Sequence, residues 1–196
     1  MTSTSPTLDV DGRRLRREQN REAVIDALVE LYEEGQYEPG ANVIAERAGL
    51  SPRSLFRYFD DIDDLNSAAI DRQLEAARPL LDPGIRDDDS TVVKIERVVE
   101  ARVRLFETIA PAARAARVCA PRHGIVAAQI RESRSYLRHQ LQRVFARELR
   151  ASGGALLPAI DALCAFEAYD LLRHDQRLSR GRTTAALVAA LTAMLA

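Results

Sequence analysis

The chain has 196 residues, of which 29% are charged and 46% are hydrophobic, with a formal net charge of -1. This composition excludes a disordered chain, and no apolar run approaches the roughly 20 residues that span a bilayer. The two cysteines lack a CxxC partner, which favours reduced thiols and a cytoplasmic protein.

The front of the chain is predicted to begin with a flexible arm and continue with short helices. Residues 1–12 lack the cationic start and apolar stretch of a signal peptide, so they are expected to form the arm. Gly35 should end the first helix, and Ser51 should cap the third, with Pro52 at its first position. Asp60 or Asp61 should cap the fourth. The four helices are predicted at about 13–34, 40–48, 51–59 and 61–78.

The rest of the chain is also predicted to be helical. The segment RPLLDPGIRDDDST interrupts the helical spacing and is the clearest boundary. Pro111 is expected to end a helix, and Ser152-Gly153-Gly154 another. Strand patterns are nearly absent, so the predicted fold is all-α, with about nine helices. The later helices are predicted at about 91–109, 111–119, 125–150, 155–176 and 182–195.

Residues 44–59 have the pattern of a helix-turn-helix. Ala45 leaves room for two helices to cross closely, and Gly49 supplies a turn conformation that side chains disfavour. The second helix then presents Arg53, Ser54 and Arg57 on its outer face. Such a helix lies in the major groove, where arginine can donate two hydrogen bonds to guanine.

The stretch IAERAGLSPRSLFRYF, followed by DIDDL, resembles the DNA-binding domain of the TetR family of bacterial transcriptional regulators. The matching residues are Ile44-Ala45, Ala48-Gly49-Leu50-Ser51, Phe56, Tyr58-Phe59 and Leu65, with Gly35 at the expected distance upstream. Two positions depart from the family pattern: Gly40 replaces a capping threonine, and Ile62 replaces a lysine. The aspartates at 60, 61, 63 and 64, which surround Ile62, have two interpretations. Either they simply stabilise the start of the fourth helix through its dipole, or the loss of a phosphate contact there weakens DNA binding and makes it depend more on the arginines before and at the start of the first helix.

The half of the chain that carries this motif is not basic. Residues 1–75 hold 9 arginines and 16 acidic residues, a net charge of -7, whereas residues 76–196 carry +6. DNA binding therefore requires a local basic patch. The arginines that begin the first helix are either placed for phosphate or minor-groove contacts or form a solvated helix face. The predicted DNA-binding residues are Arg13, Arg14, Arg16, Arg17, Asn42, Arg47, Arg53, Ser54, Arg57 and Tyr58.

The resemblance implies an arm (1–12), a helix-turn-helix DNA-binding domain (13–60) and a helical effector-binding and dimerisation domain (61–196). In the last of these, Arg102 and Glu167 fall on apolar helix faces. A buried charge is costly unless paired, so these residues form a mutual salt bridge, form a polar feature of the pocket, or have been assigned to the wrong face of their helices. The predicted pocket residues are Val99, Arg102, Phe106, Ser133, Tyr136, Gln140 and Glu167.

The predicted effector is mostly apolar, and it carries an anionic head group if Arg102 is not paired with Glu167. The last helix, TTAALVAALTAML, is apolar almost all round, so a partner chain is expected to cover it. The predicted dimer interface comprises Phe166, Tyr169, Leu187, Leu191 and Met194.

The sequence therefore predicts a ligand-responsive transcriptional regulator, a repressor released from its operator by a small molecule. The alternative is a helical dimeric interaction module whose DNA-binding motif is weakened or lost. An enzyme is not expected, because no HExxH motif, phosphate-binding glycine loop or Cys/His metal spacing is present. The predicted partners are double-stranded operator DNA, the effector and a second copy of the chain, with no cofactor, metal or membrane.

Overall fold

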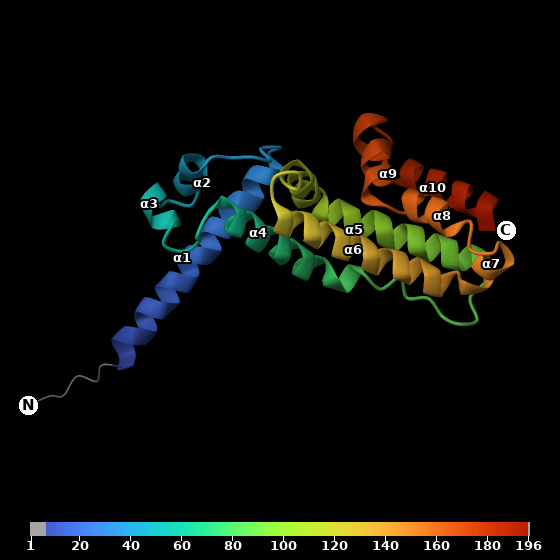
Figure 1. Ribbon diagram of the computed structural model, residues 1–196, viewed down its shortest axis with the longest axis horizontal. Coiled ribbons are helices and arrows are strands. Elements are labelled where there is room, and N and C mark those ends of the chain that lie inside the picture. The colour runs from blue at the N-terminus through green and yellow to red at the C-terminus, as the bar shows by residue number, and fades with distance from the viewer. Residues whose placement is uncertain (1–6, 196) are drawn as a thin grey trace, which may run out of the picture.

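The computed structural model describes residues 7–195, and within that range every regular element is a helix (Figure 1). The all-α fold is thus confirmed. None of the described helices is long and apolar enough to cross a membrane. The α-helices are α1 (Thr7–Glu33), α2 (Ala41–Arg47), α3 (Pro52–Leu55), α4 (Ile62–Ala77), α5 (Thr91–Cys119), α6 (Gly124–Val144), α7 (Ala146–Ala151), α8 (Leu157–Leu163), α9 (Phe166–Asp170) and α10 (Arg180–Leu195). The single turns η1 (Arg78–Leu80) and η2 (Leu171–Asp175) follow α4 and α9.

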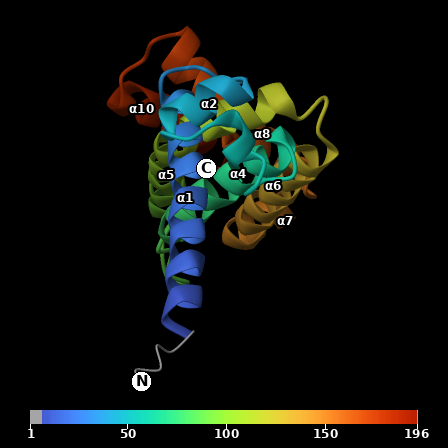
Figure 2. The ribbon, with the colours of Figure 1, turned by 90° about the vertical axis from the view of Figure 1, so that its left-hand side faces the viewer.

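The molecule is elongated, with α1 to α4 at one end and α7 to α10 towards the other (Figure 1). The first half of α1 extends beyond the rest of the molecule, as the view turned by 90° also shows (Figure 2). This helix begins at Thr7, so residues 7–12 are helical and do not belong to a flexible arm. Residues 1–6 of the predicted arm lie outside the described residues.

Local signals place the elements of the N-terminal end as predicted. Gly35 and Gly49 adopt left-handed backbone conformations, with φ of 83° and 68°, and end α1 and α2. The Ser51 hydroxyl accepts a hydrogen bond from the Ser54 backbone N–H, and the Asp61 carboxylate caps α4 through the Asp64 backbone N–H. The third helix ends at Leu55, earlier than the predicted Phe59, and continues as a turn.

Pro111 does not end a helix, which corrects the sequence prediction. One continuous helix, α5, runs from Thr91 to Cys119 with Pro111 inside it. Proline fixes φ at a helical value but removes one hydrogen bond, at a cost of about 3 kcal/mol in a helix interior. The burial of apolar side chains before and after the proline offsets that cost. The buried alanines there are Ala110, Ala112, Ala113, Ala115 and Ala116.

Two predicted long helices are each divided. The segment predicted as 125–150 forms α6 and α7, which meet at Phe145. The segment predicted as 155–176 forms α8, α9 and η2, because the backbone at Ala165 is extended (φ -84°, ψ 161°). The extended residue restarts the helical phase at Phe166. Side chains that a single helix would turn outward therefore turn inward.

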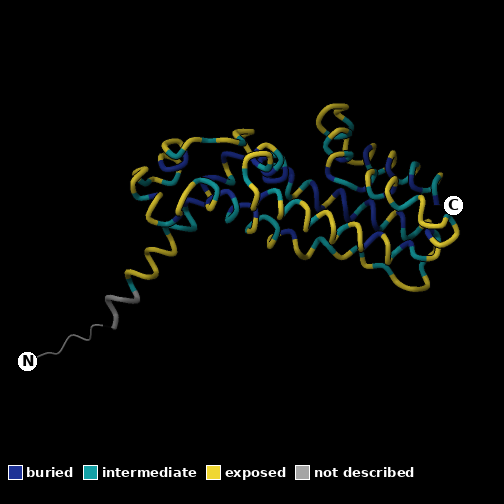
Figure 3. The backbone as a smooth tube through the Cα atoms, in the orientation of Figure 1, coloured by how far each residue is buried: buried dark blue, intermediate teal, exposed yellow. Residues whose placement is uncertain are grey.

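Each end of the molecule has its own hydrophobic core, and α5 contributes to both. The N-terminal core joins α1 to α4 and receives Ala112 and Ala115 from α5. The C-terminal core lies between α5, α6, α8, α9 and α10, and it contains Val103, Phe106 and Leu141. Buried residues are concentrated along α5, whereas residues 13–19 of α1 are exposed (Figure 3).

A buried chain of polar side chains connects three helices where the two ends meet. The Tyr32 hydroxyl on α1 donates to Asn66 Oδ1 on α4 at 2.6 Å, and Asn66 Nδ2 lies 3.8 Å from Cys119 Sγ on α5. All three residues are buried. Because sulfur is a weak acceptor, the tyrosine is the strong partner of the amide.

Tyr32→Phe should lower the free energy of unfolding by about 1–3 kcal/mol, because Asn66 Oδ1 is then buried without a donor. Urea denaturation measures this change. Tyr136→Phe is the control, because Tyr136 is exposed and its change should stay within about 0.5 kcal/mol. A loss at position 32 no larger than the loss at position 136 would contradict this role for the polar chain.

Candidate nucleic-acid interface and effector cavity

The core of the N-terminal end fixes α3 with one face outward. Ala45 is fully buried where α2 and α3 approach, and the Leu50 backbone N–H donates to the Ala45 carbonyl at 2.8 Å across the turn. Leu55 and Phe59 enter the same core as α1 and α4. The opposite side of α3 therefore cannot turn inward, and its residues lie at the surface.

Arg53 is exposed on that outer side, and Arg57 is exposed in the turn that follows α3. Among the described residues, neither has a carboxylate within ion-pair distance, so both guanidinium groups are available to an external anion or base. Ser54 is half-buried, and its hydroxyl shares a 2.9 Å hydrogen bond with the Ser51 hydroxyl. Asn42, on α2, is exposed as well.

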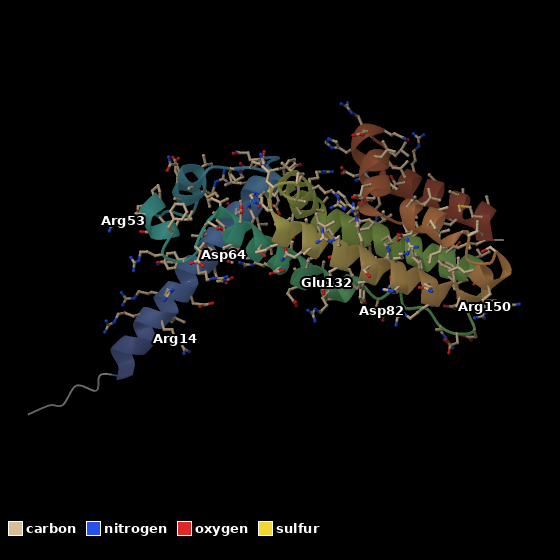
Figure 4. All side chains as sticks on the ribbon, in the orientation of Figure 1. Arg14, Arg53, Asp64, Asp82, Glu132 and Arg150 are labelled. Atoms are coloured by element: carbon tan, nitrogen blue, oxygen red, sulfur yellow. The ribbon has the colours of Figure 1, made fainter. Side chains whose placement is uncertain are left out.

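The basic start of α1 lies at the same end of the molecule as α3. Figure 4 shows Arg14 on the projecting part of α1 and Arg53 on α3, both far from Arg150 at the opposite end. Arg13, Arg16 and Arg17 are exposed on the same helix. These exposed arginines lie at one end of the molecule, in the half of the chain whose net charge is negative.

Two of the predicted DNA-binding residues make side-chain contacts within the chain. Arg47 donates to both carboxylate oxygens of Glu34, at 2.8 and 2.9 Å, and it also lies 3.5 Å from Glu30. The hydrogen bonds with Arg47 hold the pKa of Glu34 below its usual value. Arg47 is itself exposed and links α2 to the end of α1, and its assignment to DNA binding stays a prediction. Tyr58 is half-buried, and its hydroxyl accepts a hydrogen bond from Asn20 on α1 at 2.9 Å.

Phe56 is an exposed residue of this surface that the sequence did not assign to DNA binding. It is 49% exposed beside Arg53 and Arg57, and Val43 on α2 is 41% exposed. Apolar side chains at such positions can contact the methyl group of thymine. The sequence pattern predicts one helix over 51–59. Because α3 ends at Leu55, the position of Phe56 could not be inferred from that helical spacing.

The aspartates at the start of α4 stabilise that helix, in agreement with one of the two interpretations of the acidic run. Asp61 caps it, and the Asp64 carboxylate accepts a hydrogen bond from the Asp60 backbone N–H at 3.2 Å. Asp63 lies 2.6 Å from His123 Nδ1, at the start of α6. These contacts occupy three of the four carboxylates within the protein.

The C-terminal end contains a mostly apolar cavity of about 90 Å³ between α4, α5, α6, α8 and α9. Phe106, Ile109, Leu137 and Leu141 provide much of its apolar wall. The polar residues of the lining are Gln73, Arg117, Gln129, Ser133, Arg134 and Asp161. Ile109, Leu137 and Ser133 also line an outer groove of about 650 Å³, so the cavity and the groove adjoin.

Only part of the predicted pocket set lines this cavity. Phe106 and Ser133 do, and Tyr136 lines the outer groove. Val99 is buried in the C-terminal core. Gln140 is buried too, and its side chain donates to the Leu81 carbonyl at 2.6 Å, which holds the connector after η1.

Of the interpretations of Arg102 and Glu167, the mutual salt bridge is wrong, and so is the helix phase that placed Glu167 on an apolar face. Glu167 follows the break at Ala165, which turns it outward, and its carboxylate accepts from Arg117 at 2.9 Å and from Arg134. These two arginines hold the pKa of Glu167 below its usual value, even though its partial burial acts in the opposite direction. Glu167 therefore lies outside the cavity, although both of its partners line the wall.

The predicted dimer-interface residues are mostly buried within one chain, again because of the break at Ala165. Phe166 and Tyr169 pack on Phe106, with ring centroids 5.7 and 5.6 Å away. Leu187 and Leu191 of α10 are buried in the same core. Met194 is partly buried against it. Phe166, Tyr169, Leu187 and Leu191 are therefore buried within one chain, whereas Met194 keeps part of its surface.

Stability should fall at alkaline pH because of the buried Cys164 thiol. Burial raises the pKa of Cys164 to about 12. In the unfolded chain, a thiol loses its proton above its ordinary pKa of about 8.5, whereas the folded chain keeps it. The free energy of unfolding should therefore decrease as the pH rises from about 9 to about 11, and Cys164→Ala should show a shallower decrease. Equal slopes in urea denaturation series of the two proteins would contradict this effect.

Three solved structures have the same fold, although no protein-family model and no curated protein sequence matches the chain. A transcriptional regulator from Rhodococcus sp. Rha1 superposes with a TM-score of 0.72 at 17% identity, covering 89% of this chain and 95% of that one. A TetR-family transcriptional regulator from Rhodococcus sp. has a TM-score of 0.69 at 17% identity, covering 91% and 100%. Another from Mesorhizobium loti has a TM-score of 0.60 at 15% identity, covering 92% and 96%.

These likenesses extend over nearly the whole length of each chain. They include the helix-turn-helix end and the helical end that contains the cavity. The chain therefore has the fold of TetR-family transcriptional regulators.

Proposed function

We propose that the chain is a DNA-binding transcriptional regulator that a small, mostly apolar molecule releases from its operator. The observation that carries the proposal is the outer face of α3 and of the turn after it, where Arg53 and Arg57 are exposed and free of carboxylates in the described part of the chain. A recognition helix needs such donors to contact bases or phosphates. The fold supports the same assignment. Residues 13–60 would be the DNA-binding domain and residues 61–196 the effector and dimerisation domain.

The apolar cavity in the C-terminal end supports regulation by a ligand. A ligand shifts DNA binding only if it prefers one arrangement of the protein over another. One wall of the cavity comes from α4, and other residues of α4 pack in the N-terminal core beside α3. A ligand that moves α4 away from the other helices of the cavity would therefore also move the support of α3.

The proposed regulator acts as a homodimer, through residues other than those predicted from the sequence. On α10, Ala185, Ala189 and Ala193 are exposed at a spacing of four residues, so they form a row on one helix face. On the neighbouring α8, Ala159 and Ala162 are exposed. Small side chains permit close helix approach, and this apolar surface is where we place the second copy.

Selection of bound sequences from random double-stranded DNA tests the proposal. We expect enrichment of a pseudo-palindrome whose half-sites are about 34 Å apart, because two recognition helices meet successive major grooves. A gel shift with the enriched sequence then gives the affinity. No enrichment at low ionic strength would instead favour the interaction module without DNA binding, which the acidic N-terminal half otherwise supports.

A further inference from the structure

A buried arginine beside the cavity lacks an anionic partner. Arg102, on α5, is only 2% exposed. Its Nη2 donates to the Leu137 carbonyl at 3.0 Å, and its Nε has no hydrogen-bond partner. Among residues 12–195, no carboxylate lies within ion-pair distance of it. Burial of a cation without an anion is costly, so this position is unfavourable unless something else supplies the negative charge.

The other arginines around the cavity are different in this respect. Arg117 and Arg134 share the Glu167 carboxylate, and Arg138 lies 3.2 Å from Asp161. These three are partly exposed and paired, whereas Arg102 is buried and unpaired. Ion pairing stabilises a buried charge more than an exposed one, yet here the exposed arginines are paired and the buried one is not.

Arg102 lies directly behind the cavity wall. The Leu137 residue that accepts its hydrogen bond also lines the cavity. Asp161 and Cys164 line it too, and both lie close enough to Arg102 to raise its pKa against the lowering effect of burial. Phe106, one helical turn further along α5, contributes to the same wall. Arg102 is not itself part of the cavity lining, but the guanidinium group is hydrogen-bonded to the backbone of Leu137, which is.

We propose that the ligand of this cavity is an apolar carboxylic acid whose carboxylate pairs with Arg102. The inference rests on the proposed function only in treating the cavity as the effector site. The free Nε and an adjacent Nη form the two-donor fork that binds a carboxylate bidentately. Ile109, Leu137 and Leu141 would contact the apolar body, and the outer groove would receive what does not fit in about 90 Å³.

The test compares hexanoate and octanoate with 1-hexanol and 1-octanol on the whole protein, without DNA. Titration calorimetry and thermal unfolding measure binding. We expect the carboxylates to bind at least about 10-fold more tightly than the alcohols, and Arg102→Met to reduce carboxylate affinity about 10- to 150-fold. The alcohols should bind both proteins equally. Without ligand, Arg102→Met should unfold at the same temperature or higher, because methionine fills the space without a buried charge.

Two matched variants separate the Arg102 contact from a general effect of charge. Arg104→Met removes the same charge from an exposed position on α5 and should not change carboxylate affinity. Asp161→Asn removes the nearest competing carboxylate and should leave carboxylate affinity equal or higher. Any one of three results would overturn the proposal. These are weaker carboxylate binding in Asp161→Asn, equal binding of acids and alcohols, and unchanged carboxylate binding in Arg102→Met.

DNA binding is measured separately, so the two proposals can fail independently. Carboxylate binding that requires Arg102 but leaves operator affinity unchanged would support this site and contradict the proposed regulation. Release of operator DNA by the alcohols alone would contradict the Arg102 site and leave the regulator intact.

Discussion

Arg57→Ala should weaken binding to the selected operator by about 1–3 kcal/mol, which is the range for one bidentate contact to a base. Arg57 is exposed in the turn after α3, and its guanidinium group has no carboxylate partner among the described residues. Its loss should therefore affect DNA binding without affecting folding. Fluorescence anisotropy with labelled operator measures the affinity, and thermal unfolding checks the fold.

The same measurement separates base contacts from phosphate contacts. A base contact relaxes the sequence preference at one position, whereas a phosphate contact weakens all sequences equally and lowers the salt slope by about 1. Arg150→Ala is the control, because Arg150 is exposed at the opposite end of the molecule (Figure 4). Unchanged affinity and preference in both Arg53→Ala and Arg57→Ala would remove α3 from the interface.

Ala189→Glu should convert the proposed dimer into a monomer. Ala189 lies in the middle of the exposed alanine row on α10, so a two-fold interface there would bury two unpaired carboxylates. Such a burial should cost more than about 4 kcal/mol, or about 1,000-fold in the dimerisation constant. Sedimentation velocity at micromolar concentration measures the change, and operator affinity should fall with it.

Ala128→Glu introduces the same charge at an exposed position on α6 and should leave both the dimer and its DNA affinity unchanged. The monomeric fold should tolerate both substitutions, because each site is exposed and glutamate is a good helix former. A wild-type chain that is already monomeric at micromolar concentration would exclude the proposed interface.

The helix-turn-helix was predictable because its signals are local. Gly49 ends one helix, Ser51 begins the next, and Asp61 begins the fourth, each through contacts within about five residues. Such signals act in the same way in any context. The engagement of Arg47 was not predictable, because its partner Glu34 belongs to another part of the chain and its approach depends on how α1 and α2 pack.

The C-terminal end was harder to predict because packing there overrides local preferences. Pro111 is a strong local stop signal, yet buried alanines on both sides keep α5 continuous. The break at Ala165 has no glycine or proline to announce it, and what favours it is the contact of Phe166 and Tyr169 with Phe106. Because this break was not predicted, Glu167 was expected to face inward, and Phe166 and Tyr169 were expected to face outward; the structure has the opposite.

The continuity of α5 has a thermodynamic consequence. Val103 and Phe106 belong to the C-terminal core, and Ala112 and Ala115 belong to the N-terminal core, on one uninterrupted helix. Melting of either end would expose part of the other, so the two ends should lose structure in a single cooperative transition. A ligand that binds at the cavity would then raise the temperature at which the helix-turn-helix unfolds, although α2 and α3 contribute nothing to the cavity wall.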